Sequence, residues 1–130
     1  MTRIGDRGSA PVEFVMVGTL VTFMFLALLQ LGIDFYVRNV VVACLADGAR
    51  YGANADVASP RAGAARANQE LRRALGPAYA HAVVPDRQLT VGGAQVVTIS
   101  ATVRLPLLAW FLPAGPTLHA KGEALMEPRR

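Results

Sequence analysis

The feature that most constrains this chain is an uncharged, predominantly apolar stretch near its start, residues 14–33. As an α-helix rising about 1.5 Å per residue, the stretch spans about 30 Å, which is the thickness of the hydrocarbon core of a bilayer. Its two threonines are compatible with lipid, since their hydroxyls can bond back to the preceding turn, and Gln30 lies near the far interface. The stretch therefore predicts a transmembrane helix over about residues 12–33.

A single carboxylate, Glu13, stands at the start of this stretch, five positions after Gly8. A charged side chain in lipid costs roughly 2.5–3.5 kcal/mol at a helix centre and less near an end. The positive end of the helix dipole further eases the charge of Glu13. The position indicates either a function or partner for Glu13, or a side chain that extends to the lipid headgroups.

Two other N-terminal signals are disfavoured. A secretory signal peptide would use Arg3 and Arg7 as its basic region, but the apolar stretch exceeds the usual length of about 7–15 residues, and no obvious small-residue cleavage site follows. A lipoprotein signal ending at Cys44 is disfavoured because Asp34 and Arg38 separate Cys44 from the stretch. The lone cysteine excludes an internal disulfide, and we expect it as a small buried residue on a helix.

Helical periodicity continues beyond the predicted span to about Tyr51, and Gly52 with Asn54 supplies a stop. The extension carries a stripe of apolar or small residues, which we expect to pack on the folded part of the chain or on a neighbouring subunit. The stripe consists of Val37, Val41, Leu45 and Gly48.

A second helix is predicted between Ser59-Pro60, as N-cap and first position, and Gly76-Pro77. Its predicted core face is formed by Ala62, Ala65, Leu71, Ala74 and Leu75. Its predicted water-facing side is formed by Arg61, Arg66, Gln69, Glu70, Arg72 and Arg73.

The last third of the chain changes from helical periodicity to alternation. Residues 97–105 alternate strictly between apolar and polar, residues 88–91 form a shorter candidate joined to them by Gly92-Gly93, and residues 117–126 alternate as well. We therefore predict a membrane-anchored α+β fold. A long N-terminal transmembrane helix continues into an exported amphipathic helix, followed by a second short helix and a small antiparallel sheet of about three strands.

A proline-bounded loop, residues 106–116, separates the last two predicted strands and carries large apolar side chains. If exposed, it would bind a partner or touch the membrane, whereas it is equally suited to cover an open edge of the small core. Trp110 and Phe111 are its candidate subunit contacts.

Composition and motifs argue against several function classes. The net charge of +4 suggests nucleic acid, but the arginines are scattered without interleaved aromatic residues or a groove-reading motif, so no nucleic-acid partner is predicted. His81 and His119 are isolated, and the sequence has no metal-ligand spacing, phosphate loop or nucleophile elbow. We predict no catalytic residues, metal or cofactor; a membrane-anchored enzyme would need a pocket with converging polar groups.

The N-terminal third resembles a known family. Gly8, Glu13 and Phe14, followed at once by an apolar helix, resemble the prepilin-peptidase signal of the Flp subclass of type IV pilins. Residues 34–40 (DFYVRNV) and 47–52 (DGARYG) are similar to TadE-like minor pilins, or pseudopilins, of tight-adherence (Tad) pilus systems. The resemblance covers about the first 52 residues.

The resemblance implies cleavage between Gly8 and Ser9 by prepilin peptidase on the cytoplasmic side, which leaves Glu13 as the fifth residue. It also implies that Glu13 meets the new N-terminal ammonium of a neighbouring subunit, where two desolvated opposite charges offset each other. Its expected partners are prepilin peptidase, other Tad/Flp pilins with their assembly machinery, and membrane lipid.

These expectations divide the chain into a leader (residues 1–8), an N-terminal helix (residues 9–53) and a small exported α+β domain (residues 54–130). The protein would lie in the cell (inner) membrane as a single-pass protein with a cytoplasmic N-terminus, or enter the pilus. The alternative is an unprocessed single-pass scaffold or binding protein of the cell envelope, which would retain residues 1–8.

Overall fold

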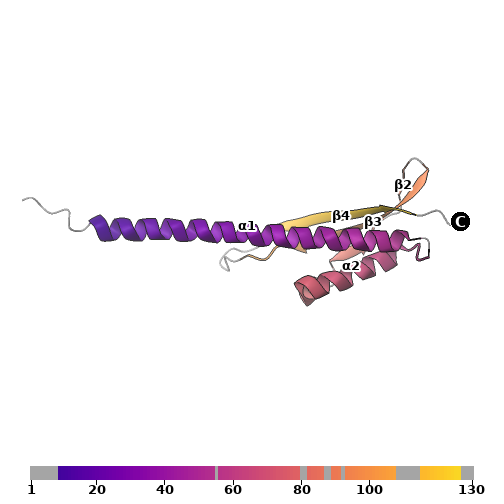
Figure 1. Ribbon diagram of the computed structural model, residues 1–130, viewed down its shortest axis with the longest axis horizontal. Helices are drawn as coiled ribbons and strands as arrows, with labels where there is room; N and C mark the ends of the chain where they lie inside the picture. The colour runs from indigo at the N-terminus through magenta and orange to yellow at the C-terminus, as the bar shows by residue number, and fades with distance from the viewer. Residues whose placement is uncertain are drawn as a thin grey trace, which may run out of the picture.

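The computed structural model describes residues 9–54, 56–79, 82–86, 89–91, 93–107 and 115–126. Helix α1 (Ser9–Ala53) contains 45 residues and is therefore about 67 Å long. Its N-terminal half extends alone, whereas its C-terminal half lies against the rest of the fold (Figure 1). Within the extended half, the hydroxyls of Thr19 and Thr22 donate to the carbonyls of Val15 and Gly18, at 2.7 and 2.8 Å. These bonds confirm that the threonines are satisfied within the helix.

Helix α2 (Pro60–Leu75) begins and ends where the sequence predicts. The Ser59 hydroxyl accepts a bond from the backbone N–H of Ala62 at 3.4 Å, and Pro60 occupies the first helical position. At the other end, Gly76 has φ of +103°, a conformation that glycine adopts without strain, and its N–H donates to the carbonyl of Arg72. A short 3₁₀ turn, η2 (Pro77–Tyr79), follows.

The sheet is antiparallel and is organised around its longest strand, β3 (Ala94–Arg104). Strand β4 (Thr117–Leu125) pairs with one edge of β3, while β1 (Val83–Pro85) and β2 (Leu89–Val91) pair one after the other with the opposite edge. The predicted antiparallel sheet is confirmed, and the structure adds β1, which no sequence pattern indicated.

Asn68 explains how so short a strand is held in place. Its side-chain amide donates to the carbonyl of Val83 at 2.9 Å, and its side-chain oxygen accepts from the N–H of Val83 at 3.1 Å. Helix α2 thus supplies β1 with a backbone-like pair of hydrogen bonds on the side away from β3.

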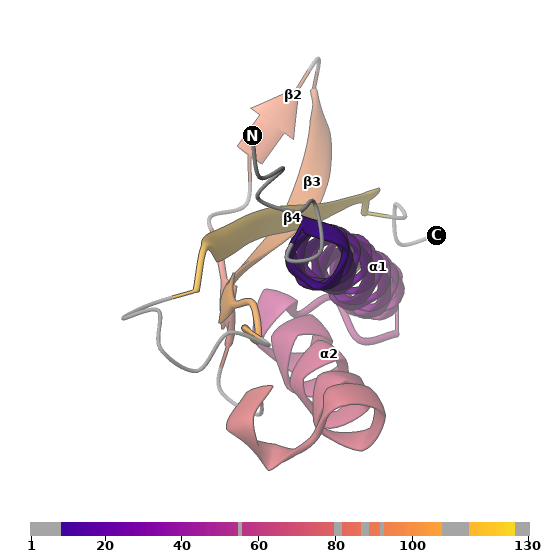
Figure 2. The ribbon, with the colours of Figure 1, turned by 90° about the vertical axis from the view of Figure 1, so that its left-hand side faces the viewer.

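Both helices pack on the sheet: α1 contacts β3 and β4, and α2 contacts β1 and β3 (Figure 2). The predicted stripe on α1 is confirmed, because Val37, Val41, Leu45 and Gly48 are buried in the core of the folded part. The C-terminal half of α1 is therefore a core element. Cys44 is also buried, as expected.

The core face of α2 agrees with the predicted one at Leu71, which is buried, and at Leu75, which packs against the core, but not at two of the predicted alanines. Ala65 and Ala74 are exposed, and the buried residues are Gly63, Ala64, Ala67 and Leu71. The reason is a close helix crossing: a Cβ on Gly48 of α1 would lie 2.6 Å from the carbonyl oxygen of Gly63 and 2.8 Å from the Cβ of Ala67. Since a side chain at Gly48 or Gly63 would collide with the other helix, the face of α2 that carries Gly63 turns inward, and Ala65 and Ala74 are left on the outside.

Candidate functional site

The candidate site is the exposed N-terminal part of α1, residues 12–31, which we call the apolar shaft. Its large apolar side chains are exposed on all sides of the helix; Phe14 is 80% exposed and Leu20 is 70% exposed. No residue is buried in its most apolar 18-residue window, and by length and composition the helix can cross a membrane. A helix that is apolar all round requires an apolar environment, which lipid or neighbouring helices can supply.

Glu13 lies at the N-terminal end of this shaft, beside Phe14, and both residues are exposed. Ser9 is the first residue of α1 and precedes Glu13 by four positions, so the two residues share one face of the helix. A new N-terminus at Ser9 would therefore place an ammonium group about one helical turn from the Glu13 carboxylate. Gly8, the residue before the predicted cleavage point, falls outside the described residues.

The opposite end of the shaft is marked by Gln30. Its Nε2 donates to Asp34 Oδ1 and to the carbonyl of Pro106, both at 2.8 Å. Leu105 donates its N–H to the carbonyl of Pro116 at 3.0 Å, so the loop between β3 and β4 starts and ends close to Gln30. No local sequence pattern indicates this junction, because the contacting residues are 76 positions apart.

The predicted subunit contacts Trp110 and Phe111 belong to this loop but lie outside the described residues. The structure therefore brings the start of their loop to the end of the shaft without describing these two side chains. Their role stays a prediction.

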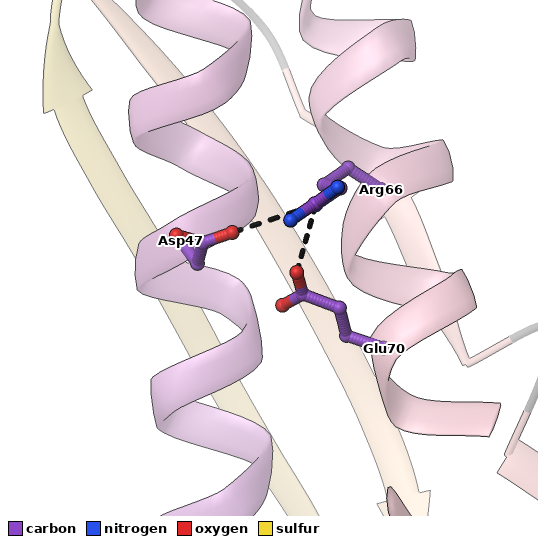
Figure 3. Close-up of polar contacts among 3 residues, drawn as sticks. All are labelled: Asp47, Arg66 and Glu70. Atoms are coloured by element: carbon purple, nitrogen blue, oxygen red, sulfur yellow. Dashed lines mark hydrogen bonds and ion pairs between the residues drawn. The ribbon is translucent and has the colours of Figure 1, made fainter. Parts of the chain in front are cut away.

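A cluster of polar side chains connects α1 and α2 on the surface (Figure 3). Arg66 Nε lies 2.7 Å from Glu70 Oε1 and 3.6 Å from Asp47 Oδ2, and its guanidinium lies 5.9 Å from the centre of the Tyr51 ring. Exposed pairs of this kind contribute about 0–1 kcal/mol, so the cluster orients α2 and adds little stability. Among the described residues, no group of three or more His, Cys, Asp or Glu could hold a metal ion.

Burial raises the pKa of the Cys44 thiol above its ordinary value of 9.0, and the nearby carboxylates of Glu70 and Asp47 add to the shift. A buried thiol of this kind stays protonated near neutral pH and is a poor nucleophile. Its position in the core, away from the shaft, indicates a packing role.

The N-terminal third of the chain matches a known family. Residues 8–50 match the family model described as TadE-like protein, which confirms the resemblance identified from the sequence. The match includes Gly8, Glu13 and the whole shaft, and it ends before α2 and the sheet. Comparisons with curated proteins and with solved structures give no match.

Proposed function

We propose that this chain is a minor pilin or pseudopilin of a Tad pilus system, a structural or assembly component that prepilin peptidase processes. The observation that supports the proposal most directly is the apolar shaft, which carries the TadE-like match and projects from the folded part with its side chains exposed (Figure 1). The C-terminal half of α1 packs in the core, and its N-terminal half is exposed. The exposed half can therefore contact lipid before assembly and other helices after it.

In this proposal the shaft spans the cell membrane before assembly. The N-terminus faces the cytoplasm, where the peptidase cleaves between Gly8 and Ser9, and the folded part lies outside. When the shaft moves from lipid into a bundle of helices, it exchanges one apolar environment for another. The specificity of subunit association therefore depends on side-chain packing and polar contacts between helices.

Glu13 supplies such a polar contact. Its carboxylate pairs with the N-terminal ammonium at Ser9 of a neighbouring subunit, which offsets the cost of holding either charge in an apolar environment. Because Glu13 sits at one fixed position on the shaft, this pair sets the axial register between subunits. The proposed partners are the peptidase, other Tad/Flp pilins, the assembly machinery and lipid.

The experiment compares the N-terminal sequence and intact mass of the membrane-derived protein from cells with and without prepilin peptidase. We expect a start at Ser9 only when the peptidase is present. In the same cells, Glu13→Ala is expected to be cleaved but to lose copurification with other pilus subunits. Glu123→Ala, which removes an exposed carboxylate on β4, serves as the matched control and should keep both properties. An uncleaved chain in both strains would instead favour the unprocessed single-pass scaffold.

A further inference from the structure

We propose that four exposed arginines at one end of the folded part bind the anionic headgroups of the membrane that the shaft spans. We call this group the arginine rim; it consists of Arg38, Arg72, Arg73 and Arg104. The proposal rests on the membrane span proposed above and assigns a lipid contact to the folded part of the chain.

Two members of the rim lie close to the end of the shaft. Arg38 is on α1, five residues beyond Ile33, the last residue of the uncharged stretch, and is therefore about 7.5 Å farther along the helix. Arg104 ends β3, and the carbonyl of Pro106, two residues later, accepts a bond from Gln30 at 2.8 Å. The headgroup layer is about 5–8 Å thick on each side of the hydrocarbon, so both arginines lie at its level.

The other two members lie in the last turn of α2, which runs back toward the shaft (Figure 1). A Cβ on Gly52 of α1 would lie 3.2 Å from the Cα of Gly63, and a Cβ on Gly48 would lie 2.8 Å from the Cβ of Ala67. Four residues forward on α2 therefore correspond to four residues back on α1. The same relation brings residues 72–73 level with about residues 42–43, about 14 Å beyond Ile33 and about 6–9 Å from the outer surface of the headgroups. A long arginine side chain can bridge this gap.

Charge is distributed unevenly along the folded part. At the end near the shaft, the described residues include the four arginines of the rim and one carboxylate, Asp34, which accepts a bond from Gln30 at 2.8 Å. Among the other residues that the structure describes beyond the shaft, acidic side chains outnumber basic ones by five to four. The acidic residues are Asp47, Asp56, Glu70, Asp86 and Glu123, and the basic residues are Arg50, Arg61, Arg66 and Lys121. The excess positive charge of the described folded part is thus concentrated at the end that faces the membrane.

The side chains of the rim are available for an external partner. All four residues are exposed, and none of their side chains forms a hydrogen bond or an ion pair with another residue that the structure describes. Arg66, in contrast, is held by Asp47 and Glu70. Guanidinium groups bind phosphate oxygens through paired hydrogen bonds, and an anionic lipid surface attracts basic side chains within about a Debye length, about 8 Å at physiological salt.

Exposed aromatic side chains between the shaft and the rim favour lipid as the partner. Phe35 and Tyr36, which are 62% and 59% exposed, occupy the turn of α1 just beyond Ile33. Tyrosine is enriched at membrane–water interfaces, where its apolar ring and its polar hydroxyl are both accommodated. The order of apolar, aromatic and basic residues along α1 matches the order of hydrocarbon, interface and headgroups. An acidic protein surface would account for the arginines alone.

The test measures the reaction of each arginine with phenylglyoxal in the full-length protein. The protein is held in nanodiscs of phosphatidylcholine, alone or mixed with phosphatidylglycerol, and modified sites are quantified by mass spectrometry. We expect phosphatidylglycerol to slow modification of the rim about fivefold per site, which corresponds to about 1 kcal/mol for each arginine near an anionic surface. Arg50 and Arg61, which are exposed farther from the shaft, are internal controls and should react equally in both lipids. High salt should abolish the difference.

Matched variants test whether the rim selects the lipid. Arg72→Gln/Arg73→Gln removes two charges from the rim, and Arg50→Gln/Arg61→Gln removes the same charge from the other end of the folded part. Native mass spectrometry should show fewer retained phosphatidylglycerol molecules for the rim variant alone. Equal retention by the two variants would overturn the proposal. The measurement on the wild-type protein does not depend on the folding of either variant.

Hydrogen exchange of the shaft in the same nanodiscs separates this proposal from the span on which it rests. If the shaft amides are protected but the rim reacts equally fast in both lipids, the rim does not bind anionic lipid, and only the rim proposal is overturned. If the rim is protected equally in both lipids, protein covers it, and the rim proposal is again overturned. If the shaft amides exchange rapidly, the span itself is wrong, and the proposed function is overturned with it.

Discussion

Gly48→Ala tests the close crossing that joins the shaft-bearing helix to the folded part. A Cβ at this position would lie 2.6 Å from the Gly63 carbonyl oxygen, 2.8 Å from the Ala67 Cβ and 3.0 Å from Ile99 Cδ1. These atoms belong to α2 and β3, so the added methyl group would push on both layers at once. Backbone and neighbouring Cβ atoms cannot rotate away, and the helices must separate.

The expected magnitude combines two opposing effects. Alanine is favoured over glycine in a helix interior by about 0.8–1.0 kcal/mol. Overpacking a core costs about 1–3 kcal/mol, and a collision with backbone belongs to the upper part of that range. The net loss in the free energy of unfolding is therefore about 1–2 kcal/mol. At about 4–8 °C per kcal/mol for a folded part of this size, Tm should fall by about 4–16 °C.

The assay is thermal unfolding of the full-length protein in detergent micelles, followed by circular dichroism. Gly32→Ala is the matched control, because it makes the same substitution in the same helix at a position where an added Cβ meets nothing within 4 Å. The control should leave Tm unchanged or raise it slightly. If Gly48→Ala behaves like Gly32→Ala, α1 and α2 do not cross as closely as the structure shows, and the reasoning fails.

Three further predictions concern the folded part. Asn68→Ala removes both bonds to Val83 and leaves buried polar groups unpaired, so we expect a loss of about 1–3 kcal/mol and faster amide exchange at Val83, read by mass spectrometry or NMR. Ser59→Ala removes the N-cap of α2 and should cost about 0.5–1 kcal/mol in the same thermal assay, a value near the low end for caps because the bond is long. Burial and, secondarily, Glu70 raise the pKa of Cys44. Unfolded chains therefore release the thiol proton at a lower pH than folded ones, so the free energy of unfolding should fall as the pH rises past 9.0. Iodoacetamide should modify Cys44 slowly in the native protein and rapidly in urea. Equal modification rates in the two states would contradict the burial of Cys44.

The elements that could be predicted are those whose signals are local. Strand β3 follows from strict alternation, which requires only that one face be buried. The ends of α2 follow from Ser59-Pro60 and Gly76-Pro77, because caps are satisfied by residues a few positions away. The apolar shaft and the Gly8 to Glu13 spacing are likewise visible in the sequence, since they require nothing from distant parts of the chain.

The features that could not be predicted depend on contacts between distant segments. Strand β1 has three residues, and its position depends on β3 and on the Asn68 side chain. The inward face of α2 is set by the Gly48–Gly63 contact, which a hydrophobic pattern dominated by alanine does not encode. At the candidate site, the bond from Gln30 to Pro106 joins residues whose proximity appears only once β3 is in place.

Because α1 is continuous, it fixes the position of Glu13 relative to the folded part of the chain. α1 runs without interruption from the predicted cleavage point to the core, so Glu13 lies about 36 Å along the helix from Val37, the first buried residue. The packing of Gly122 against Leu45 and the bond from Gln30 to Pro106 hold the sheet to the same helix. One residue inserted in the shaft would turn Glu13 by about 100° relative to the folded part. The proposed pairing of Glu13 with a neighbour would therefore set both the height of the folded part and the direction in which it faces.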